Sequence, residues 1–187
     1  MVGINTEHYW DQKLKTVPDC DKNGYWSIQT MDKINKLAKG KVLELGFGVG
    51  GILRELSKKN LEHVVGIEIS GWACEHMASY PNVETIKMEL KKDRMIPFVN
   101  DYFDMVIFLH TAEHLPQDDL MWINNEIKRV LKNGGLLIVE VPDSNGCGEH
   151  FITFHDEDAI KKHFNFNILS IEKTNRHSWL VVMKNGS

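Results

Sequence analysis

The pattern of apolar and polar positions divides the chain near residue 40. Before that point, apolar side chains recur at helical spacing in two segments, 8–15 and 26–38. Beyond it, short apolar runs alternate with segments of helical pattern, which is typical of a parallel sheet joined by crossover helices. The predicted strands in this second part are 42–45, 63–69, 83–87, 103–109 and 136–141.

Helical patterns fill the gaps between these runs, and several runs are apolar almost throughout, as expected for strands covered on both faces. Two last strand patterns, 166–173 and 178–184, are joined by a short connection and predict an antiparallel hairpin. We therefore expect an α/β fold with a seven-stranded, mostly parallel sheet and helices on both faces. The predicted helices of this part are 50–59, 71–80, 116–131 and 156–163.

Composition and charge narrow the class of protein. The 187 residues suffice for one domain, and an apolar share of 42% with a charged share of 26% is that of an ordinary globular protein. The net charge of −4, with lysines scattered along the chain, gives no general attraction to a phosphate backbone. Nucleic acid is therefore not an expected partner.

Cysteine usage and the lack of long apolar segments indicate the compartment. The three cysteines are odd in number and form no C-x-x-C pair, so the sequence predicts neither a disulfide framework nor a zinc knuckle. No segment approaches the roughly 20 apolar residues of a membrane span. Charged residues also interrupt the start of the chain, where a secretion signal needs an apolar stretch. We expect a cytoplasmic protein without a membrane span.

A glycine-rich turn follows the first strand. In the segment E-L-G-F-G-V-G-G, residues 44–51, glycines let a ligand approach the backbone where side chains would block it. At the end of the next strand, Glu68 follows Gly46 by 22 residues, and a carboxylate there can accept both hydroxyl protons of a ribose. A glycine turn alone is usually a tight connection, but the two features together predict a nucleotide-like ligand.

The same turn satisfies G-x-G-x-x-G through Gly46, Gly48 and Gly51, so an NAD(P)-binding oxidoreductase is an alternative. Three observations disfavour it. Glu44 would place negative charge where a pyrophosphate has to be received, whereas its charge suits an ammonium group. The chain is short for an enzyme with its own substrate domain, and a closing hairpin is foreign to the usual dinucleotide fold.

With these features, residues 41–184 resemble the class I S-adenosylmethionine-dependent methyltransferases, in the small-molecule branch typified by ubiquinone and menaquinone biosynthesis. Residues 44–50 look like the family's first motif, E/D-x-G-x-G-x-G, which implies a backbone turn along the methionine part of the cofactor. The resemblance also implies a Rossmann-like fold. The cofactor-binding residues that it implies are Glu44, Gly46, Phe47, Gly48, Gly50, Glu68, Ile69, Glu89, Leu90 and Leu109.

Within that set, the resemblance implies different roles along the cofactor. Glu68 matches the acid that binds the ribose, and Ile69 matches the apolar residue that lies against adenine. Residues 86–90 resemble a strand end that usually reads G-D-A, which would put Glu89 and its neighbour Leu90 beside the adenine amine. Asp93 competes with Glu89 for that role.

Two later segments resemble further motifs of the family in the same order. Residues 103–115 resemble the fourth strand and its L-E-H-L segment, and 131–139 resemble the L-K-P-G-G stretch with asparagine in place of proline. The N/D-P-P-Y of enzymes that methylate amino groups of nucleic acids or of protein glutamine is missing from the fourth strand. The resemblance therefore implies direct methyl transfer to oxygen or nitrogen of a small-molecule acceptor. A non-catalytic S-adenosylmethionine-binding subunit and a macromolecular acceptor stay open as alternatives.

Histidines are candidate catalytic residues. Methyl transfer from a sulfonium is an in-line displacement, so positioning and exclusion of water can supply much of the rate, and a base is optional. His110, at the end of the fourth strand, is the first candidate for a base that deprotonates the acceptor. His150 or His155, in the segment after the fifth strand, is the second candidate, although a solvent-exposed histidine is the commoner outcome.

The same histidines raise the question of a metal ion. His110 and His114 are four residues apart, and the chain offers more ligand types beyond the fifth strand at Cys147, His150 and His155. The first pair need not share a helix, however, and position 114 in the family often serves packing or capping. We therefore expect no metal site, and we expect Glu113 to hydrogen-bond to turn amides as a structural residue.

The resemblance also implies how the chain is organised. Residues 1–40 are expected to form a helical lid. Its aromatic residues are expected to form a wall over the cofactor, with the alternative that Trp26 only anchors a helix on the sheet; they are Tyr9, Trp10, Tyr25 and Trp26. Residues 41–187 are expected to form the S-adenosylmethionine-binding domain, as one compact unit with the lid. Because so short a chain leaves little material for an enclosing pocket, a second copy of the chain or a large acceptor is a possible cover.

Overall fold

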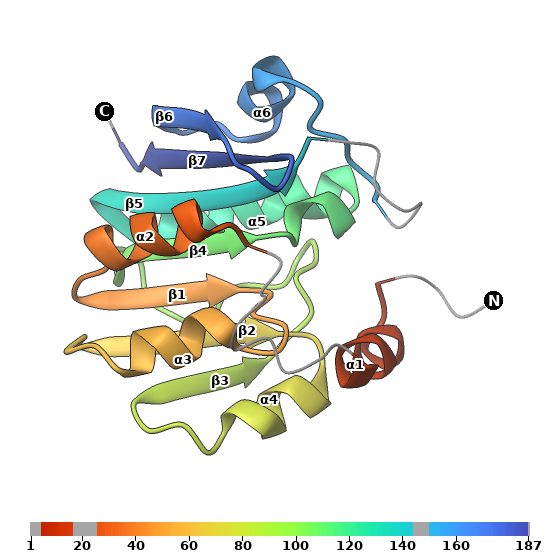
Figure 1. Ribbon diagram of the computed structural model, residues 1–187, viewed down its shortest axis with the longest axis vertical. Coiled ribbons are helices and arrows are strands. Elements are labelled where there is room, and N and C mark those ends of the chain that lie inside the picture. The colour runs from red at the N-terminus through yellow and green to blue at the C-terminus, as the bar shows by residue number, and fades with distance from the viewer. Residues whose placement is uncertain (1–4, 17–25, 144–149, 187) are drawn as a thin grey trace.

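The computed structural model describes residues 5–16, 26–143 and 150–186. Seven strands and six α-helices follow one another within these ranges, together with one short 3-10 turn (Figure 1). The strands are β1 (Lys41–Leu45), β2 (His63–Glu68), β3 (Val83–Lys87), β4 (Phe103–Leu109), β5 (Leu131–Pro142), β6 (Asn167–Lys173) and β7 (Ser178–Lys184). The helices are α1 (Glu7–Thr16), α2 (Ile28–Leu37), α3 (Gly51–Ser57), α4 (Gly71–Met77), α5 (Gln117–Val130) and α6 (Glu157–His163).

All seven strands form one sheet in the order β3-β2-β1-β4-β5-β7-β6. Strands β1 to β5 are parallel, whereas β7 runs antiparallel between β5 and β6. The predicted fold class is therefore confirmed, including the C-terminal hairpin. Because the strand order reverses between β1 and β4, the carboxyl ends of these strands border the crevice in which sheets of this type bind ligands.

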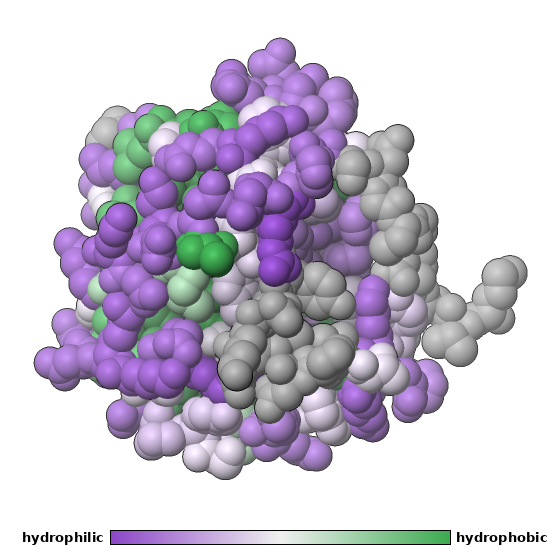
Figure 2. All heavy atoms as spheres, viewed as in Figure 1, coloured by the Kyte–Doolittle hydropathy of each residue, from purple (hydrophilic) through white to green (hydrophobic). Residues whose placement is uncertain are grey.

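Two apolar layers enclose the sheet. Along β1, Val42 packs with Ile34 of α2 and Ile52 of α3, while the next residue, Leu43, packs on the opposite face with side chains of α5 such as Ile123. This alternation follows from the two-residue period of a strand, which sends successive side chains to opposite faces. The outer surface of the face that carries α2, α3 and α4 is mainly hydrophilic (Figure 2).

The start of β5 differs from its prediction. The strand was predicted at 136–141, but it begins at Leu131, which pairs with Phe103 before the ladder shifts register and resumes at Leu136. Gly134, at φ 79°, lies in the interruption. The side chain of Asn185 donates hydrogen bonds to the carbonyls of Lys128, Leu131 and Lys132, at 3.0, 2.6 and 3.4 Å, so a distant residue holds this irregular segment.

No helix within the described ranges combines the length and the apolar character that crossing a lipid bilayer requires. The longest of them, α5, has 14 residues and an amphipathic pattern that buries Leu120, Ile123 and Ile127 against the sheet. Helix α5 is therefore a cover layer of the sheet.

The contact between β2 and α3 gives a stability prediction. A Cβ at Gly66 would lie 2.5 Å from Leu53 Cδ1 and 2.6 Å from Phe47 Cδ1, because strand and helix approach closely there. Gly66→Ala should therefore lower the free energy of unfolding by about 1–3 kcal/mol through overpacking. Urea denaturation measures the change.

Gly71→Ala is the matched control for this substitution. A Cβ at Gly71 would meet nothing nearer than the flexible ends of Glu7 and Lys87, at 3.2 and 3.4 Å, and Gly71 lies in the first turn of α4. Its stability should change by less than about 0.5 kcal/mol. Equal stability of the two variants would contradict the proposed close packing of β2 against α3.

A candidate ligand site at the carboxyl ends of the parallel strands

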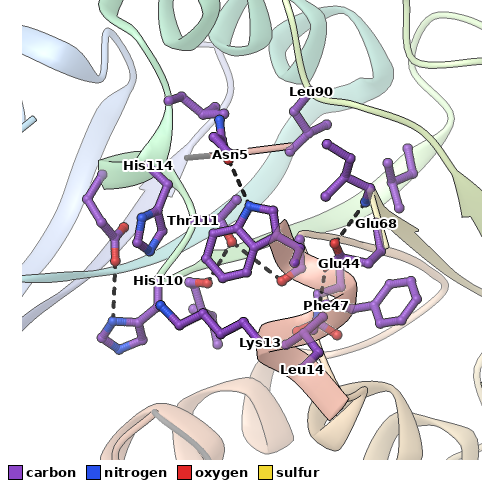
Figure 3. A pocket seen from close by; sticks show the side chains of 18 of the residues that line it. Asn5, Lys13, Leu14, Glu44, Phe47, Glu68, Leu90, His110, Thr111 and His114 are labelled. Atoms are coloured by element: carbon purple, nitrogen blue, oxygen red, sulfur yellow. Dashed lines mark hydrogen bonds and ion pairs between the residues drawn. The ribbon is translucent and has the colours of Figure 1, made fainter. Parts of the chain in front are cut away.

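A cavity of about 330 Å³ opens at the carboxyl ends of β1, β2 and β4. In Figure 3, Glu44 and Glu68 lie on one side of it, and His110 and His114 lie on the other. Nearly all of the predicted site residues line this cavity. They are Glu44, Gly46, Phe47, Gly48, Glu68, Ile69, Glu89, Leu90, Leu109, His110 and His150.

Among the candidates for cofactor binding, Gly50 and Asp93 are those that do not line the cavity. Gly50 is the N-cap of α3, and a Cβ there would lie 2.2 Å from the sulfur of Met77, so its position serves the packing of α3 on α4. Asp93 lies in the segment between β3 and β4, where the neighbouring Leu90 does reach the cavity. Between the two acids proposed for the adenine end, Glu89 is therefore the one that lines the site.

The glycine turn after β1 has the backbone conformation that its sequence predicts. Gly46 and Gly48 have φ values of 69° and 54°, in the left-handed region that residues with a Cβ rarely adopt. A Cβ at Gly46 would lie 2.3 Å from Thr111 Oγ1, whereas one at Gly48 would meet only Leu14, at 3.7 Å. The turn therefore packs against the end of β4 at Gly46 and faces the cavity at Gly48.

Glu68 fixes this turn to the end of β2. Its Oε2 accepts a hydrogen bond from the Gly48 amide at 2.9 Å, and its Oε1 accepts from the amides of Ile69 and Ser70 at 2.8 and 3.0 Å. Burial raises the pKa of the Glu68 carboxyl, and these three amides oppose the rise. A carboxylate held in this way keeps lone pairs for a hydroxyl donor in the cavity.

Glu44 is buried without comparable compensation. Its side chain is 4% exposed, and its Oε2 has no hydrogen-bond partner among the described residues. Burial raises the pKa of the Glu44 carboxyl well above its usual value, the charge of Glu68 raises it further, and Arg54 lowers it. An unsatisfied buried carboxylate is costly unless a cation or donor meets it, so the wall of the cavity at Glu44 is prepared for a positively charged group.

His110 lies between two buried acids on the other side of the cavity. Its Nδ1 is 3.6 Å from Glu113 Oε1, and its Nε2 is 3.5 Å from Glu140 Oε1, distances of ion pairs rather than of short hydrogen bonds. Burial lowers the pKa of His110, but the interactions with the two acids outweigh it and raise the pKa to about 9. The imidazole is therefore protonated at neutral pH.

Glu140 extends this arrangement to the start of α2. Its Oε2 accepts hydrogen bonds from Thr30 Oγ1 at 2.6 Å and from the Ser27 amide at 3.4 Å. Glu140 is fully buried in β5, and neither it nor Thr30 was singled out from the sequence. Nothing in the local pattern marks them, because the two segments meet only in the folded chain.

The lid predicted for residues 1–40 is described in part. Helix α1 supplies Trp10, Lys13 and Leu14 to the cavity wall. The helix is attached to α4, because Asp11 Oδ1 accepts hydrogen bonds from Ser70 Oγ at 2.5 Å and from the Trp72 amide at 3.2 Å. Trp26 also lines the cavity, while residues 17–25 lie outside the described ranges.

Three potential metal ligands meet in the wall of the cavity. Glu113, His114 and His150 each offer one ligand atom, and these atoms lie within 4.8 Å of one another. The sequence suggested a different grouping around His110, which instead turns to Glu140 with φ 48°. His155 is exposed and paired with its neighbour Asp156, and Cys147 lies outside the described ranges.

The methyltransferase domain family matches residues 42–135, which are half of the chain. A sterol 24-C-methyltransferase of Gibberella zeae is 37% identical over 100 residues, which are 51% of this chain and 26% of that protein. A sterol 24-C-methyltransferase of Schizosaccharomyces pombe is 33% identical over 127 residues, 66% of this chain and 31% of that protein. The matched segment thus spans less than a third of the length of these relatives.

Solved structures share the fold over nearly the whole chain. A SAM dependent methyltransferase from Aquifex aeolicus has a TM-score of 0.71 at 18% identity and covers 94% of this chain and 98% of its own. The N-methyltransferase NodS from Bradyrhizobium japonicum, in complex with S-adenosyl-L-homocysteine, has a TM-score of 0.72 at 14% identity, with coverages of 98% and 100%. The family and the S-adenosylmethionine cofactor predicted from the sequence are thereby confirmed: this chain belongs to the methyltransferase domain family.

Proposed function

We propose that this chain transfers a methyl group from S-adenosylmethionine directly to an oxygen or nitrogen atom of a small-molecule acceptor. The observation that carries the proposal is the unsatisfied carboxylate of Glu44, buried beside the glycine turn in the wall of the cavity. The cofactor offers an ammonium group, and an ammonium is the partner that such a carboxylate lacks.

The remaining walls fit the other parts of the cofactor. Glu68 presents its carboxylate at the end of the neighbouring strand, where ribose hydroxyls can donate to it. Ile69 and Leu90 are apolar walls for a flat ring, and Glu89 lies beside them as an acceptor for an exocyclic amine. When bound, the cofactor supplies a methyl group on a positively charged sulfur, and the chain has to hold it in line with the acceptor atom.

The acceptor region of this proposal is the side of the cavity with the histidines. His110, His114, His150 and Pro142 line it, and Trp10 of α1 covers it. Enclosure by α1 would keep water from the sulfonium and from the acceptor. The sterol 24-C acceptor named for two relatives is not carried over, because this chain matches less than a third of their length.

His110 has a positioning role in this proposal and does not act as the base. An imidazole that is already protonated at neutral pH cannot take a proton from the acceptor. Held between two acids, it keeps the ends of β4 and β5 at a fixed spacing. His150 stays a candidate for contact with the acceptor.

The proposal also covers the organisation of the chain, its compartment and its partners, as expected from the sequence. We assign residues 1–40 to the lid and 41–187 to the cofactor-binding domain, and we expect the enzyme to act in the cytoplasm, with no role for nucleic acid. A homo-oligomer is compatible with the partly open acceptor region. The oxidoreductase alternative loses its support, because β7 is antiparallel and the family match lies over the glycine turn.

Calorimetry with S-adenosylhomocysteine and with NAD(P) tests the proposed cofactor. We expect micromolar binding of S-adenosylhomocysteine and none of NAD(P), and binding of NAD(P) alone would overturn the proposal. Formation of S-adenosylhomocysteine across a panel of alcohols, phenols, amines and carboxylic acids then tests turnover. Tight cofactor binding without turnover on any acceptor would favour the non-catalytic subunit.

Glu44→Gln should raise the stability of the free protein and lower its affinity for S-adenosylhomocysteine. The substitution removes a buried charge whose desolvation outweighs the attraction of Arg54, so the free protein should become more stable at pH 8 by about 1 kcal/mol. Because the folded-state pKa of Glu44 is raised, this gain should shrink as the pH falls and the wild-type carboxyl takes up its proton. Affinity for S-adenosylhomocysteine should fall roughly 10–100-fold, as expected for a lost charged hydrogen bond.

Glu55→Gln is the control, because Glu55 is a partly exposed acid of α3 that pairs with Lys58 outside the cavity. It should leave both quantities nearly unchanged. An affinity that is equal in the Glu44→Gln variant and the wild type would remove Glu44 from the site.

The contacts of His110 with Glu113 and Glu140 predict that the free energy of unfolding depends on pH. With its pKa raised from 6.5 to about 9, His110 contributes stability that is complete below pH 6.5 and is lost as the pH rises through 9. Urea denaturation in chelator-containing buffers should show a loss of up to about 3 kcal/mol between pH 6.5 and 9.5, which His110→Gln should not share. Parallel pH profiles of the two proteins would contradict a protonated His110.

A further inference from the structure

We propose that Glu113, His114 and His150 bind one divalent transition-metal ion, zinc being the best fit, in the acceptor region of the cavity. The three side chains come from two separate parts of the chain. Glu113 and His114 belong to the 3-10 turn Ala112–His114 after β4, and His150 belongs to the segment after β5. That this metal contacts the methyl acceptor rests on the function proposed above, whereas metal binding itself does not.

The donor set indicates the class of ion. Two imidazoles and one carboxylate are the protein ligands of many catalytic zinc sites, in which the fourth position stays open for water or substrate. Imidazole nitrogen also suits iron, copper and nickel, while magnesium and calcium prefer oxygen ligands throughout. The proposal is therefore a transition-metal site with an open position.

The positions of the ligand atoms are close to those that a metal ion needs. All three atoms lie within 4.8 Å of one another. Bonds of about 2.0–2.1 Å to a tetrahedral ion would bring them to roughly 3.4 Å. A closure of at most about 1.4 Å is within reach of side-chain torsions, because His150 lies in a segment outside the helices and strands.

Two buried atoms of this group have no hydrogen-bond partner among the described residues. They are Glu113 Oε2, on a side chain that is 2% exposed, and His150 Nδ1. Buried carboxylate oxygens and ring nitrogens in folded proteins are nearly always satisfied, so an unsatisfied pair facing one cavity points to a missing partner. A metal ion satisfies a carboxylate oxygen and an imidazole nitrogen at once.

The surroundings hold the ligands in place. The backbone carbonyl of Glu113 accepts hydrogen bonds from the amides of Phe151 and Ile152 at 2.8 and 3.3 Å, which ties the segment after His150 to the turn. Trp10 packs edge-on against the His114 ring, with centroids 5.0 Å apart. The Oε1 of Glu113 faces His110, and this contact orients the carboxylate in the manner of an outer-shell partner.

A metal ion here would specify the acceptor as an oxygen nucleophile. An alcohol or phenol that coordinates a divalent cation loses its proton more readily, and the proton passes to water. The oxygen then forms a bond to the methyl carbon as the carbon–sulfur bond breaks. The electron pair of the broken bond stays on the sulfur of S-adenosylhomocysteine.

Metal binding is tested on the full chain after removal of metals with EDTA. Calorimetric titration with zinc should give one ion per chain, and cobalt should give the visible absorption of a tetrahedral site. His150→Ala and Glu113→Gln should each weaken zinc binding at least 10-fold, and circular dichroism should show that both variants are folded. His155→Ala is the matched control, because His155 is exposed and outside the cavity, and it should bind zinc like the wild type.

The outcomes separate this proposal from the proposed function. S-adenosylhomocysteine should bind with unchanged affinity in EDTA, because its proposed residues lie on the other side of the cavity. Absence of stoichiometric zinc binding, or equal zinc affinity in the wild type and His150→Ala, would overturn the metal site and leave the cofactor site standing. Zinc binding with no binding of S-adenosylhomocysteine would support the metal site and overturn the proposed function.

Discussion

The arrangement of this site depends on the burial of two carboxylates at the ends of neighbouring parallel strands. Glu44 in β1 pairs with Gly66 in β2, so the acid at the end of β2, Glu68, is close enough to raise the pKa of Glu44. Three backbone amides compensate Glu68, but Glu44 keeps an unsatisfied oxygen. A fold keeps an unfavourable buried carboxylate of this kind where a bound ligand offsets its free energy. The ligand that offsets it has to carry a positive charge.

This constraint also explains the glycine turn. Glu68 can accept from the Gly48 amide only if the backbone comes within hydrogen-bonding distance of it, and the left-handed conformations of Gly46 and Gly48 achieve this. Thr111 at the end of β4 fills the space that a side chain at Gly46 would take. The turn, Glu68 and the end of β4 therefore form one connected unit, and a change in any of them moves the walls of the cavity.

The two sides of the cavity have different electrostatic characters. On the side of β1 and β2, the buried acids Glu44 and Glu68 favour the binding of a cation. On the side of β4 and β5, a protonated imidazole lies between two acids, and the rings of His114 and His150 pack against each other in the same wall. A positively charged donor and an acceptor that has to give up a proton fit these two environments in that order. The different charges of the two sides thus orient the cofactor and the acceptor for the proposed direct transfer, which has no covalent intermediate.

Most of the fold could be predicted from the sequence, because its strands and helices carry strong local patterns. The hairpin of β6 and β7, for example, follows from two short strand patterns with a short connection. The predicted start of β5 was wrong, because the side chain of Asn185, far away in the sequence, donates hydrogen bonds to the first residues of the strand. Such long-range support leaves no trace in a local pattern.

The residues proposed for the cofactor could be named from the sequence, because they follow one another in a recognisable motif, and nearly all of them line the cavity. The arrangement of the side proposed for the acceptor could not be predicted. The state of His110 depends on Glu140 and, through it, on Thr30 at the start of α2. The grouping of His150 with the turn after β4 depends on hydrogen bonds to the carbonyl of Glu113. Contacts of this kind appear only when separate segments fold together.

A double-mutant cycle on the ligand tests the central claim most directly. Dissociation constants are measured for S-adenosylhomocysteine and for methylthioadenosine, which lacks the amino-acid portion, with the wild type and with Glu44→Gln. If the carboxylate of Glu44 binds the ammonium group, loss of the amino-acid portion should cost the wild type at least 10-fold more affinity than it costs the variant. An equal cost in both proteins would show that the buried charge of Glu44 does not recognise the cofactor, and would contradict the account.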